Sequence, residues 1–169
     1  MKRKLSTILS VLLISLITIS PAYAGGVSGK ISLGSIKFDG SAWGFGKDAV
    51  ITIDAQGVPL VYCYAPGNDN PAPGQNPPRV EASASQPASD YWTGKGKFDV
   101  HLEANADVTS WTAVQAGCPS KNWGFEVAFV FWDKVTIYVV NSKDNVMYQQ
   151  NYNCTTTHNP DSIICNEVP

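Results

Sequence analysis

The sequence of 169 residues lacks the short motifs that mark common enzyme classes and metal sites. Neither a G-x-S-x-G nucleophile pattern nor an H-E-x-x-H zinc pattern occurs, and only two positions hold histidine. The closest two cysteines, Cys154 and Cys165, are 11 positions apart, whereas structural zinc sites use closely spaced Cys or His pairs. These absences argue against the common enzyme classes, and we predict no catalytic residue, no metal and no cofactor.

A few polar residues could still support chemistry, but each has a simpler structural interpretation. His101 and Glu103 share one face of an expected strand, which is more typical of an exposed polar face than of a catalytic dyad. The run GNDN at 67–70 offers Asp69 to calcium, but the D-x-D-x-D-G pattern is absent and a turn is favoured. Glu126 lies within an aromatic-rich strand, and a distant second carboxylate would allow glycoside cleavage.

Long apolar runs are missing after residue 24. Residues 1–24 have the pattern of a secretory signal peptide: basic residues, an apolar run at 5–19, then Ala22 and Ala24 before the cleavage point. The apolar run is shorter than the roughly 20 residues that a membrane-spanning helix needs. We therefore expect residues 25–169 to be secreted and extracellular, or periplasmic in a diderm bacterium, with no membrane span.

Basic residues are scarce in this expected mature chain. Three of the 12 leave with the signal peptide while all 14 acidic residues stay, so nine basic residues face 14 acidic ones and the formal net charge is −5. Such a charge does not suit nucleic acid or an anionic membrane surface as a partner. The length fits one domain with a core of its own.

Cysteine is present at four positions, and disulfides are its expected state in an exported chain. Four cysteines allow three pairings. We expect Cys154–Cys165, because it closes a short local loop, together with Cys63–Cys118, which ties the ends of a longer segment.

Apolar and polar residues alternate through much of the mature chain, and no convincing helical stripe occurs. About eight to ten short strands are expected, and these predict one all-β domain, an antiparallel β-sandwich of the immunoglobulin-like kind. An eight-stranded β-barrel is the alternative. The best-defined expected strands are 97–104, 123–131, an edge strand at 31–38 broken at Gly34, a hairpin of 135–140 with 146–152, and a hairpin of 49–54 with 59–64.

The segment 65–90 is rich in proline, asparagine and glycine and poor in aliphatic residues. The mature chain before it is too short to fold alone, so we expect a long loop on the single domain and not a linker. Pro59 is expected at a strand start or edge, because proline cannot donate to a ladder.

Aromatic residues are the best candidates for ligand binding, because flat exposed rings can stack on sugars. Trp92, directly after the long loop, is the tryptophan that we expect to be most exposed, whereas Trp123 is expected in the core. The candidate ligand-binding residues are Tyr91, Trp92, Trp43 and Trp111.

Cys63, the PGQNPP run at 73–78, GCPSKNW at 117–123 and VTIYV at 135–139 together resemble a set of small exported bacterial proteins. Those proteins share a cysteine, a loop of proline, glycine and asparagine, and a C-P-x-x-N-W run before aliphatic strands. The similarity covers most of the chain after Gly46. The group has no established activity, so the resemblance implies export and a β fold and carries over no catalytic residue.

Three hypotheses about function follow. We favour a secreted, non-catalytic β-sandwich that acts at the cell exterior as a surface, matrix or adhesion component. The second is a carbohydrate-binding module whose exposed Trp and Tyr bind a polysaccharide or another cell-surface component. The third is a glycoside-type hydrolase with carboxylate chemistry.

Overall fold

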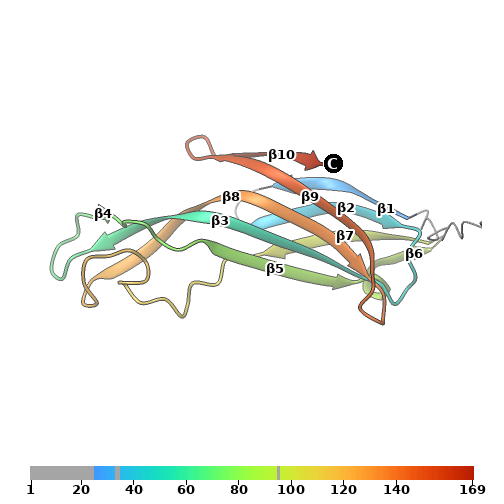
Figure 1. The fold of residues 1–169 in the computed structure, drawn as a ribbon, viewed down its shortest axis with the longest axis horizontal. Coiled ribbons are helices and arrows are strands. Elements are labelled where there is room, and N and C mark those ends of the chain that lie inside the picture. Colours follow the sequence, from blue (N-terminus) through green and yellow to red (C-terminus); the bar gives the residue numbers. More distant parts are fainter. Residues whose placement is uncertain (1–24, 33–34, 95) are drawn as a thin grey trace, which may run out of the picture.

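The computed structural model describes residues 25–32, 35–94 and 96–169, which form ten strands and one short 3-10 helix. The predicted signal peptide at 1–24 lies outside the described residues. The strands form two antiparallel sheets that pack face to face (Figure 1). The predicted all-β antiparallel sandwich is confirmed, and the strands pair into two sheets, not into the single closed sheet of the alternative barrel.

The smaller sheet, sheet A, has the strand order β1-β2-β7-β6. Its strands are β1 (Gly26–Ser32), β2 (Ile36–Trp43), β7 (Lys97–Ala104) and β6 (Trp92–Gly94). In β7 the apolar residues are buried and the polar residues between them are exposed, as its strict alternation predicts. The expectation of one broken edge strand at 31–38 is wrong, because the two halves belong to different strands that pair with each other, with Ile31 opposite Phe38.

The larger sheet, sheet B, has the order β10-β9-β8-β3-β4, and β5 also pairs with β3. Its strands are β10 (Ser162–Val168), β9 (Val146–Thr157), β8 (Gly124–Val140), β3 (Val50–Tyr64), β4 (Ala72–Pro73) and β5 (Val80–Pro87). The predicted hairpin of 135–140 with 146–152 is confirmed, with Val140 opposite Val146. The paired strands β3 and β8 continue beyond the sandwich as an arm, formed by residues 58–64 of β3 and 124–131 of β8 (Figure 1).

The main core fills the space between the two sheets. Each fully buried large aliphatic or aromatic side chain contributes about 1.5–3 kcal/mol relative to exposure. The largest contributors are Ile36, Phe38, Phe98 and Val100 from sheet A and Ile51, Ile53, Trp132, Val135, Ile137 and Val139 from sheet B.

The predicted hairpin of 49–54 with 59–64 is wrong, because Val50–Tyr64 is one continuous strand. Gly57 does not turn the chain. It lies at a register shift where β8 contributes an extra residue, and a Cβ there would come within 2.7 Å of Val130. Pro59 occupies a stretch that pairs with β8 alone, since β5 pairs only as far as Gly57 and β4 pairs only from Tyr62, so its edge position is confirmed.

The expectation of a single loop over 65–90 is wrong in its second half. Val80–Pro87 forms β5, and Ala88–Tyr91 forms the 3-10 helix. The inward residues of β5 include Ala82 and Ala84, whose small side chains give only a weak alternation signal next to the outward serines. Only the first half of the segment, around the short strand β4, is loop.

Both expected disulfides are present, Cys63–Cys118 and Cys154–Cys165. The first pair lies in the arm within a second small core formed with Val61, Ala113 and Ala116. The second joins directly paired residues of β9 and β10. With sequence separations of 55 and 11, loss of unfolded-chain entropy gives about 4 and 3 kcal/mol of stabilisation respectively.

Candidate functional site

The outer face of sheet B carries a dense group of hydrogen-bonding side chains. Strand β3 directs Thr52, Asp54 and Gln56 to this face, because the residues between them point into the core. Strands β5, β8 and β9 add their residues to the same face, since directly paired residues share a face. Three rows therefore cross four strands: Ser85–Thr52–Tyr138–Gln149, Ser83–Asp54–Thr136–Asn151 and Glu81–Gln56–Lys134–Asn153.

Hydrogen bonds along these rows hold the side chains in place. Ser83 donates its hydroxyl to Asp54 Oδ1 at 2.6 Å, and Gln56 Nε2 donates to Glu81 Oε1 at 3.2 Å. On the other side of β3, Thr136 Oγ1 donates to Asn151 Oδ1 at 3.0 Å. Each of these hydrogen bonds restricts side-chain orientation before a ligand arrives, so less ordering is required on binding.

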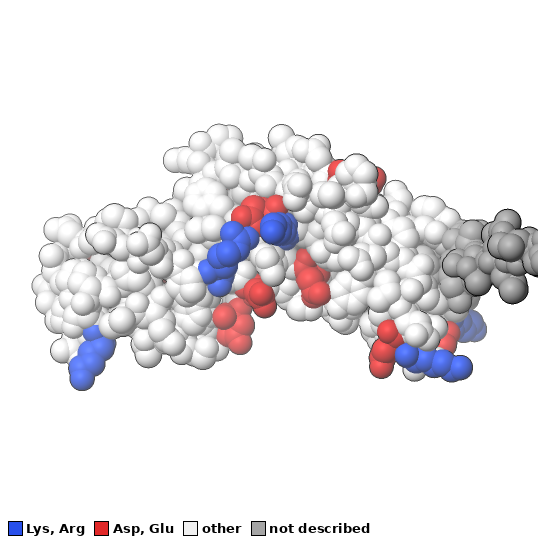
Figure 2. Space-filling view, in the orientation of Figure 1, with Lys and Arg blue, Asp and Glu red and all other residues white. Residues whose placement is uncertain are grey.

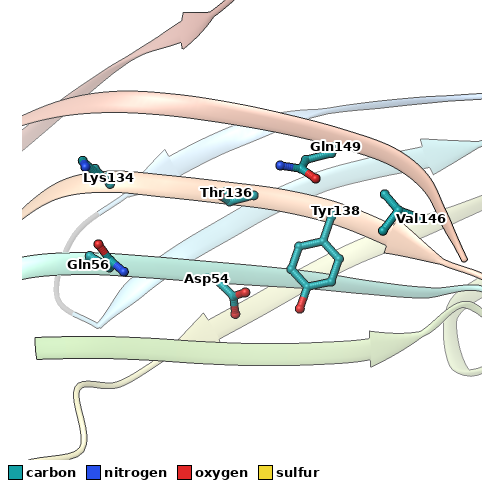
Figure 3. A pocket seen from close by; sticks show the side chains of 7 residues that line it. All are labelled: Asp54, Gln56, Lys134, Thr136, Tyr138, Val146 and Gln149. Carbon is teal, nitrogen blue, oxygen red and sulfur yellow. The ribbon is translucent and has the colours of Figure 1, made fainter. Parts of the chain in front are cut away.

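Residues of these rows, together with Val146, line an open hollow of about 500 Å³, within the range of small-ligand sites. Figure 3 shows the ring of Tyr138 extending from β8 over β3, its face turned toward the viewer and its hydroxyl end toward Asp54. The hollow is lined by Asp54, Gln56, Lys134, Thr136, Tyr138, Val146 and Gln149.

Tyr138 and Asp54 have complementary hydrogen-bonding roles in this hollow. Burial raises the pKa of Tyr138, and the negative charge of Asp54 raises it further. The phenol therefore keeps its proton at neutral pH and can donate, whereas an ionised carboxylate can only accept. The hollow thus offers an aromatic surface, a donor and an acceptor close together.

The hollow around Tyr138 has little net charge. Only Asp54 and Lys134, of opposite sign, are ionisable among the aliphatic and polar residues around Tyr138. Figure 2 shows that charged side chains on this face gather near its middle and at the end opposite the arm. Most of the polar groups that line the hollow are nevertheless hydroxyls and amides, from Gln56, Thr136, Tyr138 and Gln149.

Comparison with known proteins assigns no role to this face. No protein-family model, curated protein or solved structure matches the chain. The function of the face is therefore inferred from its own residues.

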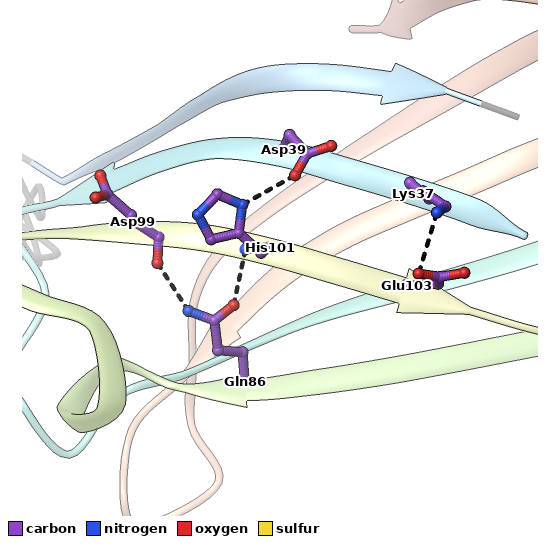
Figure 4. Close-up of polar contacts among 6 residues, drawn as sticks. All are labelled: Lys37, Asp39, Gln86, Asp99, His101 and Glu103. Carbon is purple, nitrogen blue, oxygen red and sulfur yellow. Dashed lines mark hydrogen bonds and ion pairs between the residues drawn. The ribbon is translucent and has the colours of Figure 1, made fainter.

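The outer face of sheet A holds His101 and Glu103, the two residues that were considered as a possible dyad. His101 Nδ1 lies 2.9 Å from Asp39 Oδ1 on β2, while Glu103 pairs with Lys37 at 3.2 Å (Figure 4). His101 and Glu103 therefore each pair with a neighbour on β2, as expected of an exposed polar strand face. All four side chains are largely solvent-exposed, which agrees with a polar strand face.

The four aromatic candidates lie away from the hollow and do not form one site. Tyr91 is 47 % exposed and packs edge-on against His101, and Trp43 is 41 % exposed at the end of β2. Trp92 is only half-buried and stacks on Phe98 with ring centroids 6.5 Å apart, so the prediction that it is the most exposed tryptophan is wrong. Trp111 is half-buried between the main core and the arm core.

The other residues considered in the sequence analysis have structural roles. Trp123, which was expected in the core, is half-buried against the arm core, and Trp132 fills the main core. Glu126 is exposed and accepts a hydrogen bond from Tyr64 at 3.0 Å. Within the GNDN run, Asn68 Oδ1 accepts from the Asn70 amide at 2.9 Å, as in a turn.

Two general features of the described residues also bear on function. No group of three or more His, Cys, Asp or Glu within them is placed to hold a metal ion. Nor does this part of the chain include a helix long and apolar enough to cross a membrane.

Sequence reasoning missed the residues of the hollow. Asp54 and Gln56 were assigned to a hairpin near a turn, where polar residues need no functional explanation. The signal that could have found them is the alternation in TIDAQ and KVTIYVV, which places polar groups on the same face of two long strands.

Proposed function

We propose that this chain is an exported, non-catalytic binding protein that recognises a hydroxyl-rich glycan on the outer face of sheet B. The observation that carries the proposal is the meeting of three rows of hydroxyl, amide and carboxylate groups with the ring of Tyr138 in one hollow of about 500 Å³. Sugar hydroxyls both donate and accept hydrogen bonds, and their C–H faces pack on aromatic rings, so this set of groups suits a glycan.

Binding fits the acids of this face better than hydrolysis does. A glycoside hydrolase needs one carboxylic acid kept protonated by apolar surroundings. Glu81 is exposed and Asp54 is only half-buried, and each already accepts a hydrogen bond from its neighbour in the row. These features support a non-catalytic role.

Action at the cell exterior is part of the same proposal. Two disulfides fit an oxidising compartment. The signal-peptide pattern of residues 1–24 and the resemblance to small exported bacterial proteins support export, and the two-sheet architecture is compatible with an immunoglobulin-like relationship.

The test is retention of the purified exported protein on immobilised polysaccharides, with tyrosine and tryptophan fluorescence as a second readout. Tyr138→Ala and Asp54→Asn should each weaken retention about tenfold, because each removes a direct contact that contributes on the order of 1–3 kcal/mol. Tyr91→Ala, at the end of the 3-10 helix beside sheet A, is the matched control and should bind as the unchanged protein does.

Two results would overturn the proposal. One is the absence of retention and of any fluorescence change on every glycan tested. The other is binding that survives both Tyr138→Ala and Asp54→Asn but is lost in Tyr91→Ala, which would place recognition on sheet A.

A further inference from the structure

A second hollow adjoins the first on the same sheet. Its volume is about 410 Å³, and it shares Asp54 and Gln56 with the first. From these two residues it extends the other way, to Glu81 and Ser83 on β5 and to Asn105, which follows β7. The complete lining is Asp54, Ala55, Gln56, Glu81, Ala82, Ser83, Asn105 and Asp107.

The two hollows together run across the strands and not along them. The first reaches Gln149 on β9 and the second reaches β5, and between these lie β8 and β3. Neighbouring strands are about 4.8 Å apart, so β9 and β5 are separated by roughly 14 Å. A single sugar ring cannot span that distance, whereas a short oligosaccharide segment can.

The charges of the residues that line the two hollows disfavour anionic glycans. Lys134 is its only basic residue, whereas Asp54, Glu81 and Asp107 are acidic. Asp107 also accepts hydrogen bonds from the amide and the hydroxyl of Thr109, which favour its charged form. An anionic polysaccharide would meet like charge along half of its path, and like-charge contacts are strongly unfavourable for association.

We propose that the two hollows form one continuous site for an internal segment of an uncharged polysaccharide lying across β9, β8, β3 and β5. This inference rests on the proposed function and adds the ligand class, the minimum length and the direction. Gln149 marks one end of the site and Asn105 the other, and the shared pair Asp54 and Gln56 lies at its middle.

Calorimetric titration with uncharged gluco-, manno- and galacto-oligosaccharides of increasing length tests the proposal, with polygalacturonate as the anionic counterpart. Affinity should rise with length until the ligand spans both hollows and then level off, because each added sugar gains contacts without a new association cost. Polygalacturonate should bind at least tenfold more weakly at low salt, where screening is least.

The ends of the site are tested with two variants of exposed residues. Gln149→Ala and Asn105→Ala should each lower the affinity for the longest oligosaccharide several-fold. Neither should change the affinity for the shortest oligosaccharide that binds. Asn122→Ala, an exposed change in the segment that precedes β8, is the matched control and should alter neither.

The results that would contradict this inference differ from those that would contradict the proposed function. A monosaccharide that binds as tightly as the longer chains, an effect from only one end, or preferential binding of polygalacturonate would overturn this inference while leaving a glycan-binding face. Absence of binding to every uncharged and anionic sugar would overturn the proposed function itself.

Discussion

At the scale of single residues, Gln86 shows how one buried polar side chain joins the two sheets. It is only 5 % exposed, its Nε2 donates to the Asp99 carbonyl at 2.7 Å, and its Oε1 accepts from the His101 amide at 2.8 Å (Figure 4). Strand β6 pairs with β7 only at Lys97 and Phe98. The Gln86 amide hydrogen-bonds the backbone of the next part of that β7 edge, at Asp99 and His101. A side chain from sheet B thus covers an edge of sheet A that would otherwise offer its backbone to another strand.

We expect Gln86→Leu to lower the free energy of unfolding by about 2–4 kcal/mol, because it leaves a backbone donor and a backbone acceptor without their partner. Urea denaturation measures the change. Gln75→Leu makes the same substitution at an exposed position and should stay within about 0.5 kcal/mol of the unchanged protein. Equal losses in the two variants would show that the Gln86 amide has no special role.

Residue-level prediction from the sequence worked where alternation was strict and failed where exposure depended on a distant partner. Every residue of β7 has the burial that its pattern predicts. The exposure of Trp92 was misjudged, because its ring stacks on Phe98 of β7, and local sequence does not reveal that neighbour. The hollow was missed for the same reason: β3, which contributes Asp54 and Gln56, is far in the chain from the β8–β9 hairpin that contributes the other members.

At the scale of elements, the long pair β3 and β8 determines both the arm and the candidate site. The pair contains two register shifts, after Gln56 and after Leu60 on β3. Such irregularities increase local twist and bend the strands, so they separate the polar half of the pair from the arm. Alternation predicted most of the residues of this pair as strand, but it could not distinguish one bulged strand from a hairpin, since a glycine is common to both.

Gly57 is the position where the bulged-strand geometry can be tested. A Cβ at residue 57 would lie 2.7 Å from Val130 Cγ1 and 2.8 Å from the Phe131 carbonyl oxygen. The backbone of Phe131 cannot move away without a cost in free energy. Gly57→Ala should therefore lower the free energy of unfolding by about 1–3 kcal/mol, measured by urea denaturation.

Gly124 supplies the matched control on the same strand pair. A Cβ there would meet nothing closer than Tyr64 Cβ at 3.9 Å, so Gly124→Ala should leave stability unchanged or raise it by up to about 1 kcal/mol. A Gly57→Ala variant as stable as Gly124→Ala would mean that the bulge relaxes freely.

At the scale of the whole molecule, stability depends on the packing of β9 against the main core. Tyr148 and Tyr152 are half-buried on this strand and pack against the main core, and Tyr148 meets Phe45 edge-on with ring centroids 6.3 Å apart. Burial raises the pKa of both phenols, that of Tyr152 to about 12. Near neutral pH these groups are protonated in the folded and unfolded states alike, so they introduce no pH dependence there.

The consequence is a loss of stability in alkaline solution. Between the ordinary tyrosine pKa of 10.0 and about 12, the unfolded chain releases the Tyr152 proton while the folded chain retains it. The folded state then binds more protons than the unfolded state, so the free energy of unfolding falls as pH rises through this window and is unaffected below it. Urea midpoints measured from pH 8 to pH 12 should show this decline, and Tyr152→Phe should make it shallower while changing the pH 8 midpoint much less. An equally steep decline in Tyr152→Phe would mean that this phenol is as accessible to water in the folded protein as in the unfolded chain.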